Sequence, residues 1–335
     1  MSLLLQPLDI GPLHLHNRLV FPPIATSKAA ADGTVSEELY AYYEEKSAGG
    51  AIGLVITEHS YITKAGQNRP GQPSVASDIT IEGWARLAEM FHRNGSACVC
   101  QINHSGASAT TETTGLDVVA PSDVSSPTAT GNNAPRPLTE DEIATVVGEF
   151  AAAARRVHAA GFDGVEVHAA HGYLLSQFLS PITNRRSDQY GGSLENRVRL
   201  HLEVVAAVRA AVGPDYPVFV RLGADDFIEG GTTIDDAVYA AVELERVGAS
   251  VIDVSGGISG YVRPGHTEPG YLGDLSEAVR RAVSIPVILT GGVTEAAQAE
   301  ELLANEKADL IGVGRAIFRD SGWAARAVES LPHSL

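Results

Sequence analysis

The chain has 335 residues, of which 44% are hydrophobic and 19% are charged. This composition is typical of a globular protein and excludes a disordered chain, and α/β barrels reach this length as one domain. The 24 basic and 41 acidic residues give a net charge of -17, which repels nucleic acid phosphates and anionic membranes. We therefore expect a small-molecule substrate as the partner, with neither nucleic acid nor membrane, while a homo-oligomer stays open.

The two cysteines and the first residues bear on the cellular compartment. Cys98 and Cys100 lie two residues apart in an apolar run, a spacing that fits one strand in a reducing compartment and not a disulfide. Gln6 and Pro7 interrupt the apolar start before a signal-peptide core forms, and no apolar stretch reaches the length of a membrane span. These features predict a cytoplasmic protein.

Short β-branched runs recur along the chain, and each precedes a turn-rich loop and a segment with apolar residues at helical spacing. This alternation predicts eight βα units on a parallel sheet. Their mostly continuous apolar character fits strands that are covered on both faces. The predicted strands are residues 19–25, 51–58, 97–103, 164–168, 218–222, 250–254, 287–290 and 310–313.

Helix boundaries are also marked in the sequence. Thr139 and Glu142 form a capping-box pattern ahead of an apolar stripe, and Gly161 predicts the end of that helix. Ser193 is the expected N-cap of a second helix that ends at Gly213. Ahead of all eight units, residues 3–17 predict a β-hairpin that closes the floor of the barrel.

The same eight strands would also fit an open, doubly wound sheet. That fold normally places a glycine-rich phosphate loop after its first strand, whereas residues 22–27 read Pro-Pro-Ile-Ala-Thr-Ser. We therefore expect an α/β fold of the (β/α)8 TIM-barrel class, as a single domain over residues 1–335.

Active sites of such barrels lie at the carboxyl ends of the strands, and polar residues gather there in this sequence. Two of the loops, after the seventh and eighth predicted strands, carry Gly291-Gly292 and Gly314-Arg315. Backbone N–H groups of close-approaching glycines and a nearby guanidinium are donors for a phosphate. The pair of loops predicts a phosphorylated ligand.

His168 and His171 follow the fourth predicted strand, and their spacing leaves three interpretations open. They are zinc ligands, as in a metal-dependent hydrolase that would add His104, or packing residues, or neutral donors to a substrate oxygen. Barrel metallohydrolases carry a His pair after the first strand, where this chain has Ile24-Ala25, so we rank the donor pair first. Tyr173 in the same loop is a candidate proton donor.

Arg221 interrupts an apolar strand and needs a partner, because a permanent buried cation is otherwise severely destabilising. Glu166 on the neighbouring strand is the simple candidate for that partner. The edge of an electron-rich cofactor is the other.

Several motifs together resemble the old yellow enzyme family of NAD(P)H:flavin oxidoreductases, from about Pro7 to Phe318. They are the Pro7-Leu8 and Asn17-Arg18 opening, Gln101-x-x-His104-x-Gly106, His168-Ala-Ala-His171-Gly-Tyr173, Phe178-Leu179-Ser180-Pro181, and Asn184-x-Arg186-x-Asp188-x-Tyr190-Gly191-Gly192. The resemblance implies non-covalent FMN, with NADPH or NADH as the reductant.

The resemblance also implies roles for individual residues. Most of them would contact FMN: Pro23, Ile24 and Ala25 against the isoalloxazine, His59 nearby, Gln101 and Arg221 at the polar edge of the ring, and Gly292, Gly314 and Arg315 at the phosphate. Ser27, His168, His171 and Tyr173 would bind substrate. Family members often have Thr or Cys where this chain has Ala25, whose methyl group cannot bond the flavin.

The implied activity is a ping-pong reaction, in which hydride passes from NAD(P)H through flavin N5 to an electron-poor alkene such as an α,β-unsaturated carbonyl compound. His168 and His171 would grip the substrate oxygen, and Tyr173 would deliver the proton. Two alternatives stay open at this point: a metal-dependent barrel hydrolase, and a flavin-binding protein with little catalysis.

Overall fold

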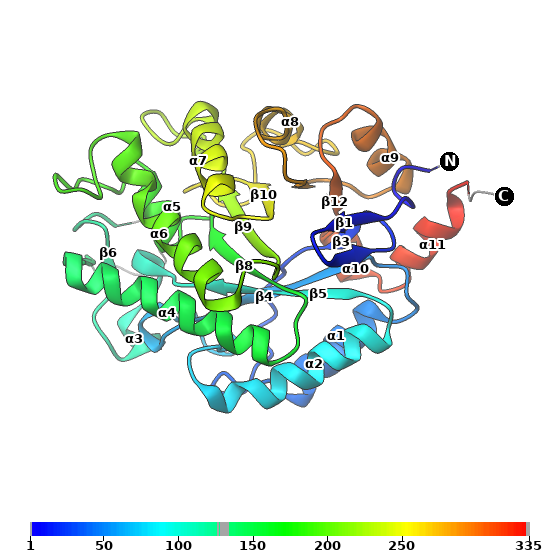
Figure 1. Cartoon of the computed structure of the whole chain (residues 1–335), viewed down its shortest axis with the longest axis horizontal. Helices are drawn as coiled ribbons and strands as arrows, with labels where there is room; N and C mark the ends of the chain where they lie inside the picture. Colours follow the sequence, from blue (N-terminus) through cyan, green and yellow to red (C-terminus); the bar gives the residue numbers. More distant parts are fainter. Residues whose placement is uncertain (1, 126, 128–133, 333–335) are drawn as a thin grey trace.

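The structure is a computed structural model that describes residues 2–125, 127 and 134–332. Eight parallel strands close into a barrel in the order β10-β11-β12-β3-β4-β5-β8-β9, which confirms the predicted fold (Figure 1). The barrel strands are β3 (Leu19–Phe21), β4 (Leu54–Tyr61), β5 (Ala97–Asn103), β8 (Gly164–Ala169), β9 (Val218–Gly223), β10 (Val251–Ser255), β11 (Val287–Thr290) and β12 (Leu310–Gly312).

Helices surround the barrel and cover the outer faces of its strands (Figure 1). They are α1 (Glu37–Ser47), α2 (Ile81–Arg93), α3 (Thr111–Thr114), α4 (Glu140–Ala159), α5 (Leu174–Leu179), α6 (Leu194–Val212), α7 (Ile234–Arg246), α8 (Gly273–Ala282), α9 (Ala296–Ala304), α10 (Arg315–Arg319) and α11 (Trp323–Ser330). Single 3-10 turns span Lys64–Gly66, Asp78–Thr80 and Gly106–Ser108. A short parallel pair, β6 (Val119–Ala120) and β7 (Arg136–Pro137), was not predicted.

The helix boundaries follow the predicted caps. The Thr139 hydroxyl accepts a hydrogen bond from the Glu142 N–H, and the Glu142 carboxylate accepts one from the Thr139 N–H. The capping box of α4 is therefore complete. Ser193 caps α6 by accepting from the Asn196 N–H. Each cap satisfies N–H groups that the first helical turn leaves without intrahelical partners.

Two barrel strands depart from their predicted bounds by three or more residues. β3 ends at Phe21 and not at residue 25, because Pro22 and Pro23 have no N–H to continue the ladder. β4 starts at Leu54 and not at residue 51, because Asn17 Nδ2 donates to the Ala51 carbonyl at 2.9 Å. It then runs on to Tyr61 through an irregularity in the pairing between Thr57 and Ser60.

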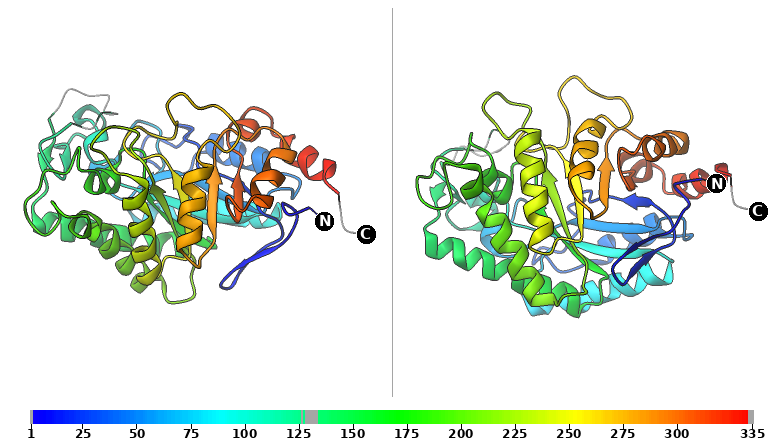
Figure 2. Two further views of the ribbon diagram at one scale, coloured as in Figure 1. Left: turned by 90° about the horizontal axis from the view of Figure 1, so that it is seen from above. Right: turned by 45° about the horizontal axis from the view of Figure 1, so that its top comes forward.

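The N-terminal hairpin closes the barrel floor, as predicted. Its strands β1 (Leu8–Ile10) and β2 (Leu13–Leu15) pair antiparallel, and Leu15 is fully buried. The apolar hairpin side chains pack in one cluster with inward-facing barrel residues, among them Val99, Phe219 and Leu310. In the left view of Figure 2 the dark blue hairpin lies at the end of the barrel opposite the long loop that precedes α8.

Side chains alternate between the barrel interior and the helix layer along the strands, apart from the irregularity in β4. On β5, Val99 belongs to the interior floor cluster, so Gln101 and Asn103 continue inward above it. On β9, Phe219 likewise belongs to the floor cluster, and Arg221, two residues further along, points to the interior above it. The interior is therefore apolar near the hairpin and polar near the carboxyl ends of the strands.

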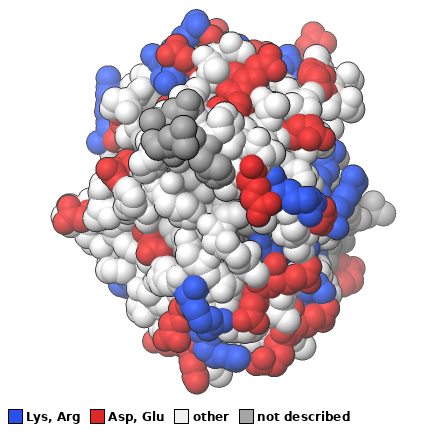
Figure 3. Space-filling model, turned by 90° about the vertical axis from the view of Figure 1, so that its right-hand side faces the viewer, with Lys and Arg blue, Asp and Glu red and all other residues white. Residues whose placement is uncertain are grey.

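No helix in the described ranges is long and apolar enough to cross a membrane. On the face drawn in Figure 3, basic side chains stand beside acidic ones around a largely uncharged area. That face offers no broad basic patch for a polyanion.

Burial of His201 on α6 predicts a pH-dependent contribution to stability. Burial lowers the pKa of this imidazole from 6.5 to about 4. Between these values the unfolded chain binds a proton that the folded chain does not, so the free energy of unfolding falls as the pH drops. We expect His201→Leu to remove this contribution, worth at most about 1.4 kcal/mol per pH unit.

Urea unfolding between pH 7 and 4.5 measures this effect. His14→Gln is the matched control, because the His14 side chain is 65% exposed. An identical pH slope for His201→Leu and the wild type would contradict the prediction.

Candidate functional site

The carboxyl ends of the strands surround a cavity of about 730 Å³. All the predicted site residues except Ser27 line it: Pro23, Ile24, Ala25, His59, Gln101, His168, His171, Tyr173, Arg221, Gly292, Gly314 and Arg315. Ser27 is exposed, has a φ of 60°, and does not line the cavity formed by the described residues. The structure thus brings the predicted residues together from seven of the strand ends, while their roles stay predictions.

His168, His171 and Tyr173 form one cluster at the end of β8. The ring centroids of His168 and His171 lie 4.9 Å apart, and those of His168 and Tyr173 lie 5.0 Å apart, both nearly perpendicular. His171 adopts a φ of 60°, a left-handed conformation that costs energy for a residue with a Cβ. Its backbone N–H donates to the Gly256 carbonyl at 3.3 Å, which helps to hold this conformation.

Hydrogen bonds indicate which nitrogen of His168 carries the ring proton. Its Nδ1 accepts the Ala170 N–H at 3.3 Å, so the proton lies on Nε2 and is free to donate. His171 Nε2 lies 2.6 Å from the Ser255 hydroxyl. Burial holds the pKa of both imidazoles well below 6.5, and the charge of Arg221 lowers both further, so both rings are neutral.

The Tyr173 phenol keeps its proton at neutral pH. Burial raises its pKa above 10, and the positive charges of Arg69 and Arg221 oppose that increase. A buried phenol beside two cations is protonated yet better able to release its proton than burial alone would allow.

His59 lies beside Tyr173, with ring centroids 5.1 Å apart. Its Nε2 accepts from Arg69 Nη2 at 3.1 Å, because a guanidinium can only donate. Burial lowers the pKa of His59 to about 3, so this ring is also neutral. Arg69 was not among the predicted site residues, because nothing in the local pattern of a loop residue indicates that it reaches this cavity.

The partner of Arg221 is Asp253 and not Glu166, which corrects the simpler sequence-based expectation. Arg221 Nε lies 3.4 Å from Asp253 Oδ2, whereas Glu166 accepts a hydrogen bond from Gln101 Nε2 at 2.6 Å. Asp253 was detectable, because it shares strand parity with Val251, which faces the barrel floor. Burial raises the pKa of both carboxyl groups, and the positive charge of Arg221 counteracts the rise.

The donors and acceptors on the cavity wall fit a planar polar cofactor with a phosphate. Gln101 Oε1, Arg221 Nε and Thr290 Oγ1 are buried without a hydrogen-bond partner in the part of the chain that the structure describes. Such atoms require a partner that the protein itself does not supply. Gly292 lines the cavity with a φ of 69°, and a Cβ there would lie 2.5 Å from the Glu268 carbonyl oxygen, so only glycine fits this turn without strain.

The hydrolase alternative required His104 beside His168 and His171. His104 is buried outside the cavity wall, where its Nδ1 accepts the Gly106 N–H at 3.1 Å. Within the described ranges, the group of potential metal ligands close enough to share an ion is His92, Cys98 and Asp163, which lies elsewhere. The geometry therefore does not favour a hydrolase that uses these three histidines.

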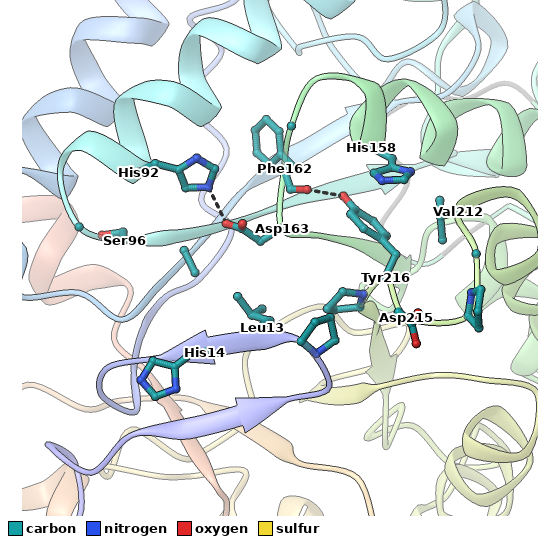
Figure 4. A pocket seen from close by; sticks show the side chains of 17 residues that line it. Leu13, His14, His92, Ser96, His158, Phe162, Asp163, Val212, Asp215 and Tyr216 are labelled. Atoms are coloured by element: carbon teal, nitrogen blue, oxygen red, sulfur yellow. Dashed lines mark hydrogen bonds and ion pairs between the residues drawn. The ribbon is translucent and has the colours of Figure 1, made fainter.

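A second hollow of about 880 Å³ lies under the hairpin, at the amino ends of the strands (Figure 4). His92 Nε2 lies 2.8 Å from Asp163 Oδ2, and the Tyr216 hydroxyl donates to the Phe162 carbonyl at 2.9 Å. These polar groups satisfy one another, and this end of a barrel generally serves stability. The cavity at the carboxyl ends is therefore the candidate active site.

Comparisons with known proteins find a family that spans nearly the whole chain. Residues 3–334 match the model of the NADH:flavin oxidoreductase / NADH oxidase family. The NADH oxidase of Thermoanaerobacter brockii is 41% identical over 96% of this chain, and the NADPH dehydrogenase of Halalkalibacterium halodurans is 37% identical over 95% of it. The chain covers 50% of the first relative and 91% of the second.

The fold comparison leads to the same group of proteins. The old yellow enzyme homologue from Zymomonas mobilis superposes with a TM-score of 0.85 and 28% identity, covering 99% of this chain and 94% of that one. The family match spans nearly the whole chain, and Gly292, Gly314 and Arg315 line the cavity. The chain therefore belongs to the NADH:flavin oxidoreductase / NADH oxidase family, the old yellow enzyme family that its motifs resemble, whose cofactor is FMN.

Proposed function

We propose that this chain reduces an electron-poor alkene, such as an α,β-unsaturated carbonyl compound, with NAD(P)H as the reductant. The observation that carries the proposal is the cluster of two neutral imidazoles and a protonated phenol in one cavity. FMN, when bound, would supply the hydride-transfer chemistry that links NAD(P)H to the alkene. The balance is one hydride from NAD(P)H and one proton added across the double bond.

The residues of the chain divide the remaining work. Pro23, Ile24 and Ala25 would support the flavin ring, Gln101 and Arg221 would bond its polar edge, and Gly292, Gly314 and Arg315 would hold the phosphate. Arg221 would favour the reduced cofactor, because its fixed positive charge stabilises negative charge that gathers beside it. His59 borders the substrate side of the cavity through its contact with Tyr173.

His168 and His171 would donate hydrogen bonds to the carbonyl oxygen of the acceptor. These bonds withdraw electron density from the double bond and so favour hydride addition at the β-carbon. Tyr173 then gives its proton to the α-carbon. Neutral imidazoles suit this role, because each offers one N–H without adding another charge beside Arg221.

We expect Tyr173→Phe to slow alkene reduction by roughly 10²- to 10⁴-fold, the range for loss of a general acid. Reduction of the flavin by NAD(P)H should be unaffected, because that step needs no proton from Tyr173. Anaerobic stopped-flow absorbance measures the two half-reactions separately. Equal losses in both would show that Tyr173 has another role.

We expect the double variant His168→Ala, His171→Ala to lose the long-wavelength absorbance band that a bound phenol produces with FMN. Both donors to the phenol oxygen would be missing. His14→Gln, at the far end of the barrel, is the control and should keep the band. A band of normal intensity in the double variant would show that neither histidine is needed to bind the phenol oxygen.

Gly292→Ala should weaken FMN binding by about tenfold or more, because a Cβ is unfavourable at positive φ and must displace the Glu268 carbonyl. Gly230→Ala is matched in φ, at 76°, but its Cβ would meet no atom within 4 Å. Titration of the apoprotein with FMN, followed by flavin fluorescence, compares the two. Equal FMN affinity of the two variants would exclude the β11 loop from the phosphate site.

Wild-type turnover also separates the proposal from its alternatives. A yellow protein that NAD(P)H reduces quickly and an enone reoxidises supports an ene-reductase. Tight flavin binding with neither reaction would instead indicate a flavin-binding protein with little catalysis.

A further inference from the structure

Arg69 is held on the cavity wall by the loop between β4 and α2. Its backbone carbonyl accepts hydrogen bonds from Gln67 Nε2 at 3.0 Å and from the Gln72 N–H at 3.4 Å. The loop is anchored further along, where the Gly71 carbonyl accepts the Ala29 N–H at 3.0 Å. The position of Arg69 is therefore built by the fold.

The guanidinium of Arg69 forms no salt bridge in the part of the chain that the structure describes, and its Nε is buried there without a hydrogen-bond partner. The Glu58 carboxylate is close enough for the charge of Arg69 to lower its pKa, but its oxygens accept hydrogen bonds from the Thr26 N–H and hydroxyl. By contrast, Arg221 in the same cavity faces Asp253 directly. A half-buried cation without a directly bonded anion is destabilising, and a guanidinium presents two parallel donors that match a carboxylate.

The contact between Arg69 and His59 places this free cation beside the proton donor. Arg69 Nη2 donates to His59 Nε2 at 3.1 Å, and the His59 ring lies against Tyr173. Because His59 is neutral, it satisfies one N–H of Arg69 without cancelling its charge. Arg69 thus belongs to the substrate side of the cavity.

We propose that Arg69 binds a carboxylate of the acceptor, so that the substrate is an α,β-unsaturated carbonyl compound bearing a carboxylate group. The inference rests on the proposed function and specifies its substrate class. The carbonyl oxygen lies at His168 and His171, the carboxylate lies at Arg69, and the double bond lies between them, beside Tyr173. The phosphates of NAD(P)H are the other source of an anion in this cavity, and the experiment separates the two.

The test compares a carboxylate-bearing enone, 4-oxo-2-pentenoate, with its methyl ester as acceptors for the FMN-loaded protein. Wild type should prefer the carboxylate. Arg69→Gln should lower the ratio of kcat/KM for the acid to that for the ester by about 10- to 100-fold, the size of a charge-assisted hydrogen-bond pair. The ratio for Arg69→Lys should lie between those of the wild type and Arg69→Gln, because an ammonium keeps the charge but lacks the paired donors.

Lys64→Gln is the matched control. Lys64 lies in the same loop, is exposed, and does not line the cavity, yet its replacement changes the net charge by the same amount. This variant should keep the wild-type ratio of acid to ester. A ratio that falls as far in Lys64→Gln as in Arg69→Gln would reduce the effect to general electrostatics and overturn the proposal.

Two further outcomes would also overturn it. One is an unchanged acid-to-ester ratio in Arg69→Gln with normal ester reduction, which leaves the proposed function standing. The other is a raised KM for NADPH or NADH in flavin reduction with an unchanged ratio, which would assign Arg69 to the nicotinamide phosphates.

A binding measurement keeps the test independent of turnover. Titration of the FMN-loaded protein with 4-hydroxybenzoate and with its methyl ester, followed by flavin absorbance, gives two dissociation constants. The acid should bind more tightly to wild type than the ester, and Arg69→Gln should lose about 10-fold or more of that preference. If the wild type reduces neither enone, the proposed function fails. The binding measurement still tests Arg69 in that case. Equal affinity for the acid and the ester, in both the wild type and Arg69→Gln, would overturn its role.

Discussion

Closure of eight parallel strands into a barrel is the constraint on which the rest of this structure depends. Closure points every second side chain of a strand toward a narrow interior, where each side chain must either pack or find a polar partner. Near the hairpin the interior is filled by apolar side chains such as Val99 and Phe219. Two residues further along the same strands, the interior holds Gln101 and Arg221. The alternating pattern therefore produces both the apolar interior next to the hairpin and the polar interior at the carboxyl ends of the strands.

The burial of Arg221 at the carboxyl ends of the strands affects the pKa values of the groups around it. Asp253 offsets its charge at 3.4 Å, yet the atoms of both groups retain unmet hydrogen-bonding capacity. The same cation lowers the pKa of His168 and His171, which burial already lowers, and it opposes the effect of burial on Tyr173. One buried charge thus helps to keep both imidazoles neutral and limits the rise that burial causes in the pKa of the phenol.

The two ends of the barrel contrast in how their polar groups are satisfied. Under the hairpin, His92 pairs with Asp163, and Tyr216 bonds a backbone carbonyl. At the opposite end, Gln101, Thr290 and Arg69 each keep a buried polar atom without a partner among the residues that the structure describes. Unmet donors and acceptors are costly unless a ligand completes them. Several line this cavity and none is found among the described residues that line the hollow under the hairpin, which distinguishes the two.

Local patterns in the sequence determined the order of strands and helices, the capping box at Thr139, the floor hairpin and the gathering of His168, His171, Tyr173 and the glycine loops at one end. These features depend on near neighbours in the chain, on strand parity, or on the rule that parallel strands end at one edge. The motifs added the family and its FMN. Strand parity made Asp253 one candidate partner of Arg221, and tertiary structure decided for Asp253 over Glu166. Tertiary structure alone decided that Ser27 lies off the cavity wall and that Arg69 lies beside His59. Those contacts join residues from separate strands and loops, and their geometry is set by barrel closure and loop packing, which no local pattern specifies.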